Sequence, residues 1–253
     1  MRNIAAIAQK ELRSYFSSPM AYIVIGFFLL PFGVFFYLYL QSFVKQGLQS
    51  AQFGGAMNIN QQVIRGVLQN ASVIILFIMP MITMRTYSEE KRSGTIELLL
   101  TSPLSDVEII LGKFFGALGL YAAMLGMTLL YIGILFWFGN PEWKAVVAAY
   151  LGLLLMGGAF VSIGLLISST TSNQIVAGVV TFVVFLLLWI VGWFADSSGS
   201  TIGPITSYLS ITEHFDDFSK GIIDTKHVVY YLSLITFGLF LTSKSVDTER
   251  WKG

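Results

Sequence analysis

Nine of the 29 charged residues in this 253-residue chain lie in one stretch, Arg85 to Lys113, which separates two apolar runs. The stretch carries both signs of charge, on Arg85, Glu89, Glu90, Lys91, Arg92, Glu97, Asp106, Glu108 and Lys113. The chemistry that such side chains offer is polar contact with a partner in water. A chain that is otherwise apolar and gathers its charge in one loop is expected to present that loop to another molecule.

The sequence offers little for catalysis. His214 and His227 are the two histidines, and no set of nucleophile, base and acid follows from the residue spacing. The chain has no Gly-x-x-x-x-Gly-Lys-Ser/Thr phosphate loop. The absence of cysteine excludes disulfides, zinc–thiolate sites and catalytic thiols. We therefore expect no catalytic residue, no cofactor and no enzymatic activity in this chain.

We predict no metal site, although two alternatives were weighed. Met79, Met81 and Met84 have the thioether ligands of a soft-metal path, but methionine is a common gap-filler in cores. An outer cation is the second alternative, held by Glu213, His214, Asp216 and Asp217. A solvated or inter-subunit polar loop explains those four residues more simply. Nothing in the chain indicates a nucleic-acid partner.

Composition places the chain in a membrane. Hydrophobic residues make up 55% and charged residues 11%, whereas a soluble domain has about 25% charged residues. A helix needs about 20 apolar residues to cross a bilayer. The sequence therefore predicts an all-α membrane protein, one domain over residues 1–253, in contact with membrane lipid. The six predicted spans cover residues 21–44, 63–84, 109–138, 145–167, 174–195 and 227–243, and the ends of the second and sixth are the least defined.

Orientation follows from the distribution of Lys and Arg, which favours the cytoplasmic side. The two termini and the central loop, residues 85–108 with Lys113, carry ten of these residues, and the other side carries five. Both termini and this loop are therefore predicted to be cytoplasmic. Residues 196–226 form the longest predicted outer segment. Residues 1–19 predict an amphipathic helix in the membrane interface, or else a cytoplasmic helix packed on the protein.

The elements that position the charged stretch follow from its turn and cap residues. Ser93-Gly94-Thr95 predicts a break, after which a short helix runs from Ile96 to Thr101. Ser102-Pro103 ends that helix, because a proline disfavours helix at the preceding residue. Ser105 then caps the next helix, with Glu108 completing a capping box. A solvated hairpin is the simpler alternative for this pattern.

No Asp, Glu, Lys, Arg or His lies inside the apolar runs at the centre of the six spans, residues 21–44, 66–84, 114–139, 145–174, 175–195 and 228–243. Ionisable groups within a membrane usually mark proton relays and ion paths. A proton-coupled carrier is therefore disfavoured, whereas sodium coupling through broken helices stays open. If the protein does work, its energy is expected to arrive from another polypeptide through the charged loop.

The charged loop resembles a signature of ABC-2 type permeases, the membrane subunits of ATP-binding-cassette exporters. The matching text is Glu-Glu-Lys-Arg-Ser-Gly-Thr-Ile-Glu-Leu-Leu-Leu-Thr-Ser-Pro-Leu-Ser at residues 89–105. The resemblance extends over most of the chain, including the amphipathic N-terminus and the outer segment before the last span. Thr212 to Phe218, with Gly221, is similar to the branch associated with gliding-motility exporters.

The resemblance implies a cytoplasmic coupling helix that binds an ABC ATPase subunit, which holds the ATP and magnesium. Carried onto this chain, the coupling residues are Glu89, Glu90, Arg92, Gly94, Thr95, Glu97, Leu98 and Leu99. The N-terminal helix corresponds to a connecting helix that touches the same ATPase. A second permease half, either the same chain or a sister subunit with an outer domain, completes the pathway. The implied location is the bacterial cytoplasmic (inner) membrane.

Two further groups of residues are candidates for packing and for the transport path. Gly112 and Gly116, and likewise Gly158 and Ser162, have the small-x-x-x-small spacing of close helix contacts. We expect these contacts within one subunit, with a dimer seam as the alternative. Polar residues of the second span, Gln69, Asn70 and Ser72, either line a substrate path or make structural hydrogen bonds.

The preferred hypothesis is therefore the permease subunit of an ATP-driven exporter. A non-transporting membrane mechanotransmitter or scaffold, also driven by an ATPase, is the second hypothesis. An ion-coupled secondary carrier is the third, and it would transport without any ATPase. The cargo does not follow from the sequence.

Overall fold

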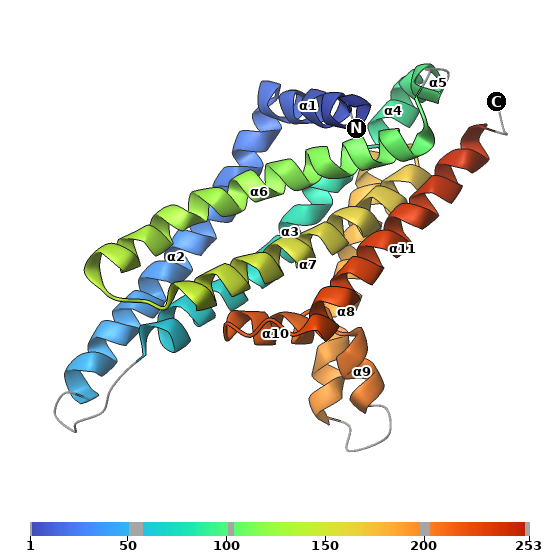
Figure 1. Ribbon diagram of the computed structural model, residues 1–253. Helices are drawn as coiled ribbons and strands as arrows, with labels where there is room; N and C mark the ends of the chain where they lie inside the picture. Colours follow the sequence, from blue (N-terminus) through green and yellow to red (C-terminus); the bar gives the residue numbers. More distant parts are fainter. Residues whose placement is uncertain (1, 51–57, 101–103, 198–202, 251–253) are drawn as a thin grey trace.

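The computed structural model describes residues 2–50, 58–100, 104–197 and 203–250, and these are almost entirely helical (Figure 1). Six helical segments are long and apolar enough to cross a membrane, which confirms the predicted fold class. The spans lie in α2 (Pro19–Ser50), α3 (Arg65–Thr83), α6 (Asp106–Phe138), α7 (Trp143–Thr170), α8 (Gln174–Ser197) and α11 (Thr225–Arg250). The shorter elements are α1 (Arg2–Ser17), the π-helix η1 (Asn60–Ile64), α4 (Ser88–Ser93), α5 (Thr95–Leu100), α9 (Gly203–Leu209) and α10 (Glu213–Ser219).

The core of the bundle is formed by α3 and α7. Their most apolar stretches are 61% and 67% buried, whereas those of α8 and α11 are each 22% buried. Small residues let α7 take this central place, because Gly157 and Gly164 leave room for Tyr121 of α6 and Thr83 of α3. The outer helices consequently expose apolar side chains, such as Phe27 on α2, to their surroundings.

Helix α1 lies across one end of the bundle and packs along the first turns of α6 (Figure 1). Its apolar face contacts a row of glycines. A Cβ atom added at Gly112 would lie 2.5 Å from Cβ of Ile7, and one added at Gly116 would lie 2.6 Å from Cβ of Glu11. The Gly112 and Gly116 pair therefore receives α1, an element outside the six spans, and brings its backbone close to α6.

Gly158 and Ser162 lie on α7 and contact α11. A Cβ atom at Gly158 would lie 3.0 Å from Cδ1 of Ile235, and the Ser162 hydroxyl donates a hydrogen bond to the carbonyl of Leu234 over 3.4 Å. Gly238 of α11 in turn approaches the side chain of Ser162. Small residues on both helices thus allow one intrachain seam between α7 and α11.

The charged loop folds as helix, break, helix, as its turn residues indicate. Gly94 ends α4 with a φ of 71°, a left-handed conformation that glycine adopts without strain. The following helix, α5, begins at Thr95 itself rather than after it, since the Thr95 hydroxyl bonds back to Ser93 over 2.9 Å. The capping box of Ser105 and Glu108 at the start of α6 is confirmed.

The two ends of the bundle differ in what covers them. We call the end that carries α1, α4 and α5 the α1 end, and the opposite end, which carries α9 and α10, the α10 end (Figure 1). At the α10 end, Phe218 of α10 packs against Gly152 of α7. Tyr231 of α11 donates a hydrogen bond to the carbonyl of Ile211 over 2.7 Å. These contacts fix the segment before α11 to the bundle.

Replacing Gly116 with leucine is expected to displace α1 from α6, because the new side chain overlaps Glu11. Overpacking of this kind costs about 1–3 kcal/mol of unfolding free energy. Thermal unfolding in detergent measures the loss, and limited trypsin cleavage after Arg13 reports whether α1 has detached. Gly126→Leu on the same helix is the matched control, since no atom lies within 4 Å of a Cβ there. Equal stability and equal cleavage of the two variants would contradict this packing.

Candidate functional site

The candidate site is a buried lysine at the α1 end. Lys113 of α6 is 1% exposed, and its ammonium group lies 2.8 Å from Oε1 of Glu90 and 3.1 Å from Oε1 of Glu11. It also donates to the carbonyl of Thr86 over 2.9 Å and lies 5.0 Å from the centre of the Tyr87 ring. One side chain thus contacts α1, α4 and the turn between α3 and α4. We call Lys113, Glu11 and Glu90 the lysine node.

The node is stable only as a complete set. A buried charge is costly unless it is paired and hydrogen-bonded, and here two carboxylates and a carbonyl surround one ammonium group. The aromatic face of Tyr87 adds a cation–π contact. Removing one partner leaves charge uncompensated in a poorly solvated place. The positions of α1, α4 and α6 are therefore interdependent.

The start of α6 is also tied to the N-terminus. The Asn3 side chain donates to Oε1 of Glu108 over 3.0 Å, and the backbone amide of Ser105 donates to Oε2 of the same carboxylate. Glu108 therefore caps α6 and attaches the first turn of α1 to the start of α6. This contact aligns Glu11, two turns further along α1, with Lys113.

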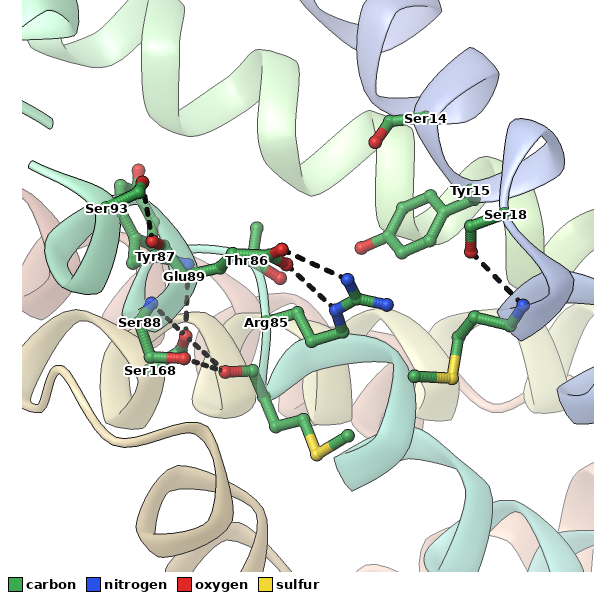
Figure 2. A network of polar contacts seen from close by, with 12 residues as sticks. Ser14, Tyr15, Ser18, Arg85, Thr86, Tyr87, Ser88, Glu89, Ser93 and Ser168 are labelled. Atoms are coloured by element: carbon green, nitrogen blue, oxygen red, sulfur yellow. Dashed lines mark hydrogen bonds and ion pairs between the residues drawn. The ribbon is translucent and has the colours of Figure 1, made fainter. Parts of the chain in front are cut away.

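A second set of hydrogen bonds connects the turn before α4 to α7 (Figure 2). The Ser168 hydroxyl accepts from the backbone amides of Tyr87 and Ser88, each over 3.1 Å, and donates to the carbonyl of Met84 over 3.1 Å. One small side chain near the end of α7 thus satisfies backbone groups that the break between α3 and α4 would leave unpaired. A displacement of α4 is thereby coupled to the core helix.

A small groove separates α1 from α4 beside the lysine node. It has a volume of about 170 Å³ and is lined by residues of both helices, including Lys10, Ser14 and Glu89. Arg85 forms two hydrogen bonds with Glu89, of 2.8 and 3.1 Å (Figure 2). Tyr15 points from α1 to the same turn and donates to the carbonyl of Ile82. Burial, reinforced by the charge of Glu11, raises the pKa of Tyr15, so this phenol stays protonated and continues to donate.

The structure divides the predicted coupling residues into two groups. The Glu90 carboxylate turns inward to Lys113, whereas Glu89, Arg92 and Glu97 are exposed at the surface of α4 and α5. Gly94 and Thr95 are exposed at the junction of these helices. The backbone of Leu98 and Leu99 is helical, and their side chains lie outside the described part of the chain.

Sequence reasoning did not single out Lys113, Glu11 or Ser168 as site residues. Lys113 was visible as the last charge before a long apolar run, a position where a lysine either extends to water or finds partners. Glu11 falls in the predicted amphipathic helix of residues 1–19. No pattern in the sequence pairs residues 11, 90 and 113, because only the fold brings them together.

The polar residues of α3 do not converge on one path. Asn70 donates to the Tyr39 hydroxyl over 3.0 Å and so faces α2. Gln69 donates to Oδ1 of Asp216 over 2.8 Å, and Ser72 donates to the carbonyl of Gln69. Gln69 and Ser72, but not Asn70, line a cavity of about 810 Å³ at the α10 end.

Ion pairs hold α10 in place beside this cavity. Asp216 lies 2.8 Å from Arg65 of α3 and 2.5 Å from Lys220. Burial by itself would raise the pKa of Asp216, but hydrogen bonds from Lys220 and Arg65 together lower it. The hydrogen bond between Lys220 and Asp216, with a weaker one to Asp217, raises the pKa of Lys220. Among the described residues, no group of three or more His, Asp or Glu is arranged to hold a metal ion.

Comparison with known proteins relates this architecture to membrane transport. A family model described as ABC-2 family transporter protein matches residues 5–243. The chain is also 29% identical over 145 residues to a protein of Escherichia coli strain K12 named "Probable multidrug ABC transporter permease YbhR". A protein of the same name from Escherichia coli O157:H7 has the same identity. The matched region covers 56% of this chain and 38% of the length of these relatives.

Replacing Lys113 with methionine is expected to destabilise the protein by about 3–5 kcal/mol, because Glu11 and Glu90 lose the charge that compensates them. Equilibrium unfolding in detergent measures the loss. Adding Glu11→Gln and Glu90→Gln to this variant is expected to restore part of the stability, since no uncompensated charge then remains.

Lys244→Met is the control for this experiment, because Lys244 is 63% exposed and lies 3.7 Å from Asp247. An exposed pair contributes about 0–1 kcal/mol. A loss at Lys113 no larger than the loss at Lys244 would show that the lysine node does not join the helices.

The ion pairs of Asp216 are expected to make stability depend on acid pH. Because the folded pKa is lowered below the unfolded value of about 3.9, the stabilisation is present above that pH and is lost as the pH falls through the folded pKa. Asp216→Asn should be less stable than the wild type near neutral pH, and the difference should shrink below about pH 4. Thermal unfolding across this range measures the effect. Asp247→Asn is the control, and a difference that is independent of pH would refute the assignment.

Proposed function

Since the chain belongs to the ABC-2 transporter family, we propose that it is the membrane-spanning permease subunit of an ATP-binding-cassette exporter, driven by a separate ATPase subunit. The lysine node is the observation that carries this proposal, because it connects exposed helices at the α1 end to a spanning helix. An energy source outside the chain fits this arrangement. ATP and magnesium belong to the partner, and this chain is no enzyme.

The docking face for the ATPase is formed by α4, α5 and the adjoining surface of α1. Glu89, Arg92 and Glu97 present charge there, and Gly94 gives the turn between the two short helices. Thr95, Leu98 and Leu99 complete the coupling surface in this proposal. Glu90 has a different role, since its carboxylate is committed to Lys113. It anchors the coupling helix rather than contacting the ATPase.

Movement of the docking face reaches the spans by two routes. A shift of α4 carries Glu90, which moves Lys113 and with it α6 and Glu11 of α1. The same shift pulls on Ser168, which holds the end of α7. Both routes run through short polar contacts between packed helices, which are stiffer than an open loop. ATP-driven closure of the ATPase therefore tilts the bundle as a unit and opens the path at the other end.

The membrane placement follows from the same proposal. The α1 end and both termini lie in the cytoplasm of a bacterium, and the α10 end lies outside the cytoplasmic membrane. The exposed apolar faces of α2 and α8 fit lipid and a second permease half, either another copy or a sister subunit. Neither match supports the gliding-motility branch, so that assignment is not carried forward.

The docking face is tested by charge reversal. Arg92→Glu and Glu97→Arg are expected to abolish co-purification with the ATPase subunit and its stimulation, because both side chains are exposed on the face that meets it. Asn140→Arg is the control, since this exposed residue lies in the turn between α6 and α7 at the far end of the bundle. Unchanged binding and stimulation in both charge-reversal variants would rule out the docking face.

Gly94 gives a separate readout of backbone geometry. Gly94→Val is expected to weaken ATPase binding, because a β-branched residue is strained at a φ of 71°. Gly94→Asn should bind more strongly than Gly94→Val, since asparagine tolerates the left-handed region. Cargo transport by the reconstituted complex in vesicles then separates an exporter from a mechanotransmitter.

A further inference from the structure

Two buried histidines at the α10 end face each other at hydrogen-bond distance. His214 of α10 is 5% exposed and His227 of α11 is 6% exposed. Their Nδ1 atoms are 2.6 Å apart. The ring of His214 also stacks on Tyr230, with ring centres 3.7 Å apart, which fixes its orientation. These histidines are the two in the chain and have no part in the docking face.

The remaining ring nitrogens each face an acceptor. Nε2 of His214 lies 2.9 Å from the carbonyl oxygen of Tyr208 on α9. Nε2 of His227 lies 2.9 Å from Oδ2 of Asp217 on α10. A carbonyl oxygen only accepts, so His214 must donate from Nε2. Its Nδ1 atom therefore accepts in the neutral ring.

The cluster holds one more hydrogen than two neutral imidazoles and a carboxylate carry. Three contacts need three hydrogens, whereas two neutral imidazoles supply two N–H groups. Without a third hydrogen, either the two Nδ1 lone pairs face each other at 2.6 Å, or the Nε2 lone pair of His227 faces the Asp217 carboxylate at 2.9 Å. The third hydrogen sits on His227, which then pairs with the Asp217 carboxylate, or on the Asp217 carboxyl group. In both arrangements His227 donates from Nδ1 to His214.

We propose that His214, His227 and Asp217 form a proton-binding site at the α10 end, and that the bound proton holds α10 against α11 in the wall of the adjacent cavity. All three residues line the cavity of about 810 Å³, opposite Trp189 and Trp193 of α8. The contacts join α9, α10 and the start of α11. Loss of the proton leaves His227 with one hydrogen for its contacts to His214 and Asp217, both on α10, so one contact becomes repulsive and α10 moves from α11.

The neighbouring charges favour the ion-pair arrangement. The hydrogen bond from His227 lowers the pKa of Asp217, whereas burial lowers the pKa of His214. The other charged groups are partnered around the cluster: Arg65 of α3 and Lys220 with Asp216, and Lys226 with Asp224 before α11. Glu213 on α10 lines the same cavity, and the phenols of Tyr208, Tyr230 and Tyr231 complete the surroundings. His227 faces a carboxylate whereas His214 faces a carbonyl, so the geometry places the ion pair between His227 and Asp217.

The site lies at the outer end of α11, away from the middle of the spans, so it senses protons rather than passing them through the membrane. It extends the proposed function without depending on it. Both measurements below use the full-length chain alone, and ATPase binding does not enter them. Failure of the export proposal therefore leaves this test intact.

Nitrogen NMR of histidine-labelled protein tests the proton count, because the chain contains two histidines. In detergent with EDTA, we expect both rings to titrate in one shared step, with scalar coupling between the two Nδ1 atoms below the midpoint. Asp217→Asn keeps an oxygen acceptor but removes the charge, so the midpoint should fall by about one pH unit or more, a tenfold loss of proton affinity. Independent titration of the rings near about pH 6.5, without coupling, would overturn the proposal.

Thiol labelling tests whether the bound proton holds α10 against α11. The chain has no cysteine of its own, so each introduced thiol is unique. Ser72→Cys places a unique thiol in the cavity wall, and Asn140→Cys places one on an exposed turn. The labelling rate at position 72, divided by the rate at position 140, cancels the ordinary pH dependence of thiol reactivity. We expect this ratio to rise above the NMR midpoint and to lose its pH dependence when His214→Gln and His227→Gln are added. A ratio that stays constant across the midpoint would show that the proton does not hold α10 against α11.

Discussion

One buried ammonium group sets the arrangement of the α1 end. Lys113 is held by Glu11, Glu90 and the carbonyl of Thr86, and each of these comes from a different part of the chain. A buried charge permits few geometries, because every displaced partner leaves a polar group without compensation. Apolar packing alone would tolerate sliding of α1 on α6. Gly112 and Gly116 let α1 approach α6 closely. The lysine node fixes the position of α1 along α6.

The two ends of the bundle solve the same problem with different chemistry. At the α1 end a lysine with two carboxylates fixes α1, α4 and α6 to one another. At the α10 end a histidine pair fixes helices that border a cavity. The lysine node joins three helices through ion pairs, which suits a mechanical joint. A histidine cluster changes its proton content near neutral pH, which suits a contact that opens and closes.

Between the two ends, α3 and α7 provide the buried core, and residues 66–83 and 145–170 carry no charged side chains. Their contacts are close, because glycines on α7 admit Thr83 and Tyr121. Such packing transmits displacement, since a densely packed interior has little space in which to absorb it. Ser168, at the end of α7, connects this core to the turn before α4. In the proposed function, a displacement of the docking face therefore reaches the core helices α3 and α7.

The sequence by itself determined the class, the six helices, the break at Gly94 and the capped start of α6. Run length and charge depletion decide what crosses a membrane, and Gly94, Ser105 and Glu108 act through local backbone geometry. The roles of individual polar residues were decided by the tertiary structure. Glu90 turned inward to Lys113, Asn70 turned to α2, and the histidines met across α10 and α11. These pairings join residues far apart in sequence, and their energies depend on burial that no local pattern specifies.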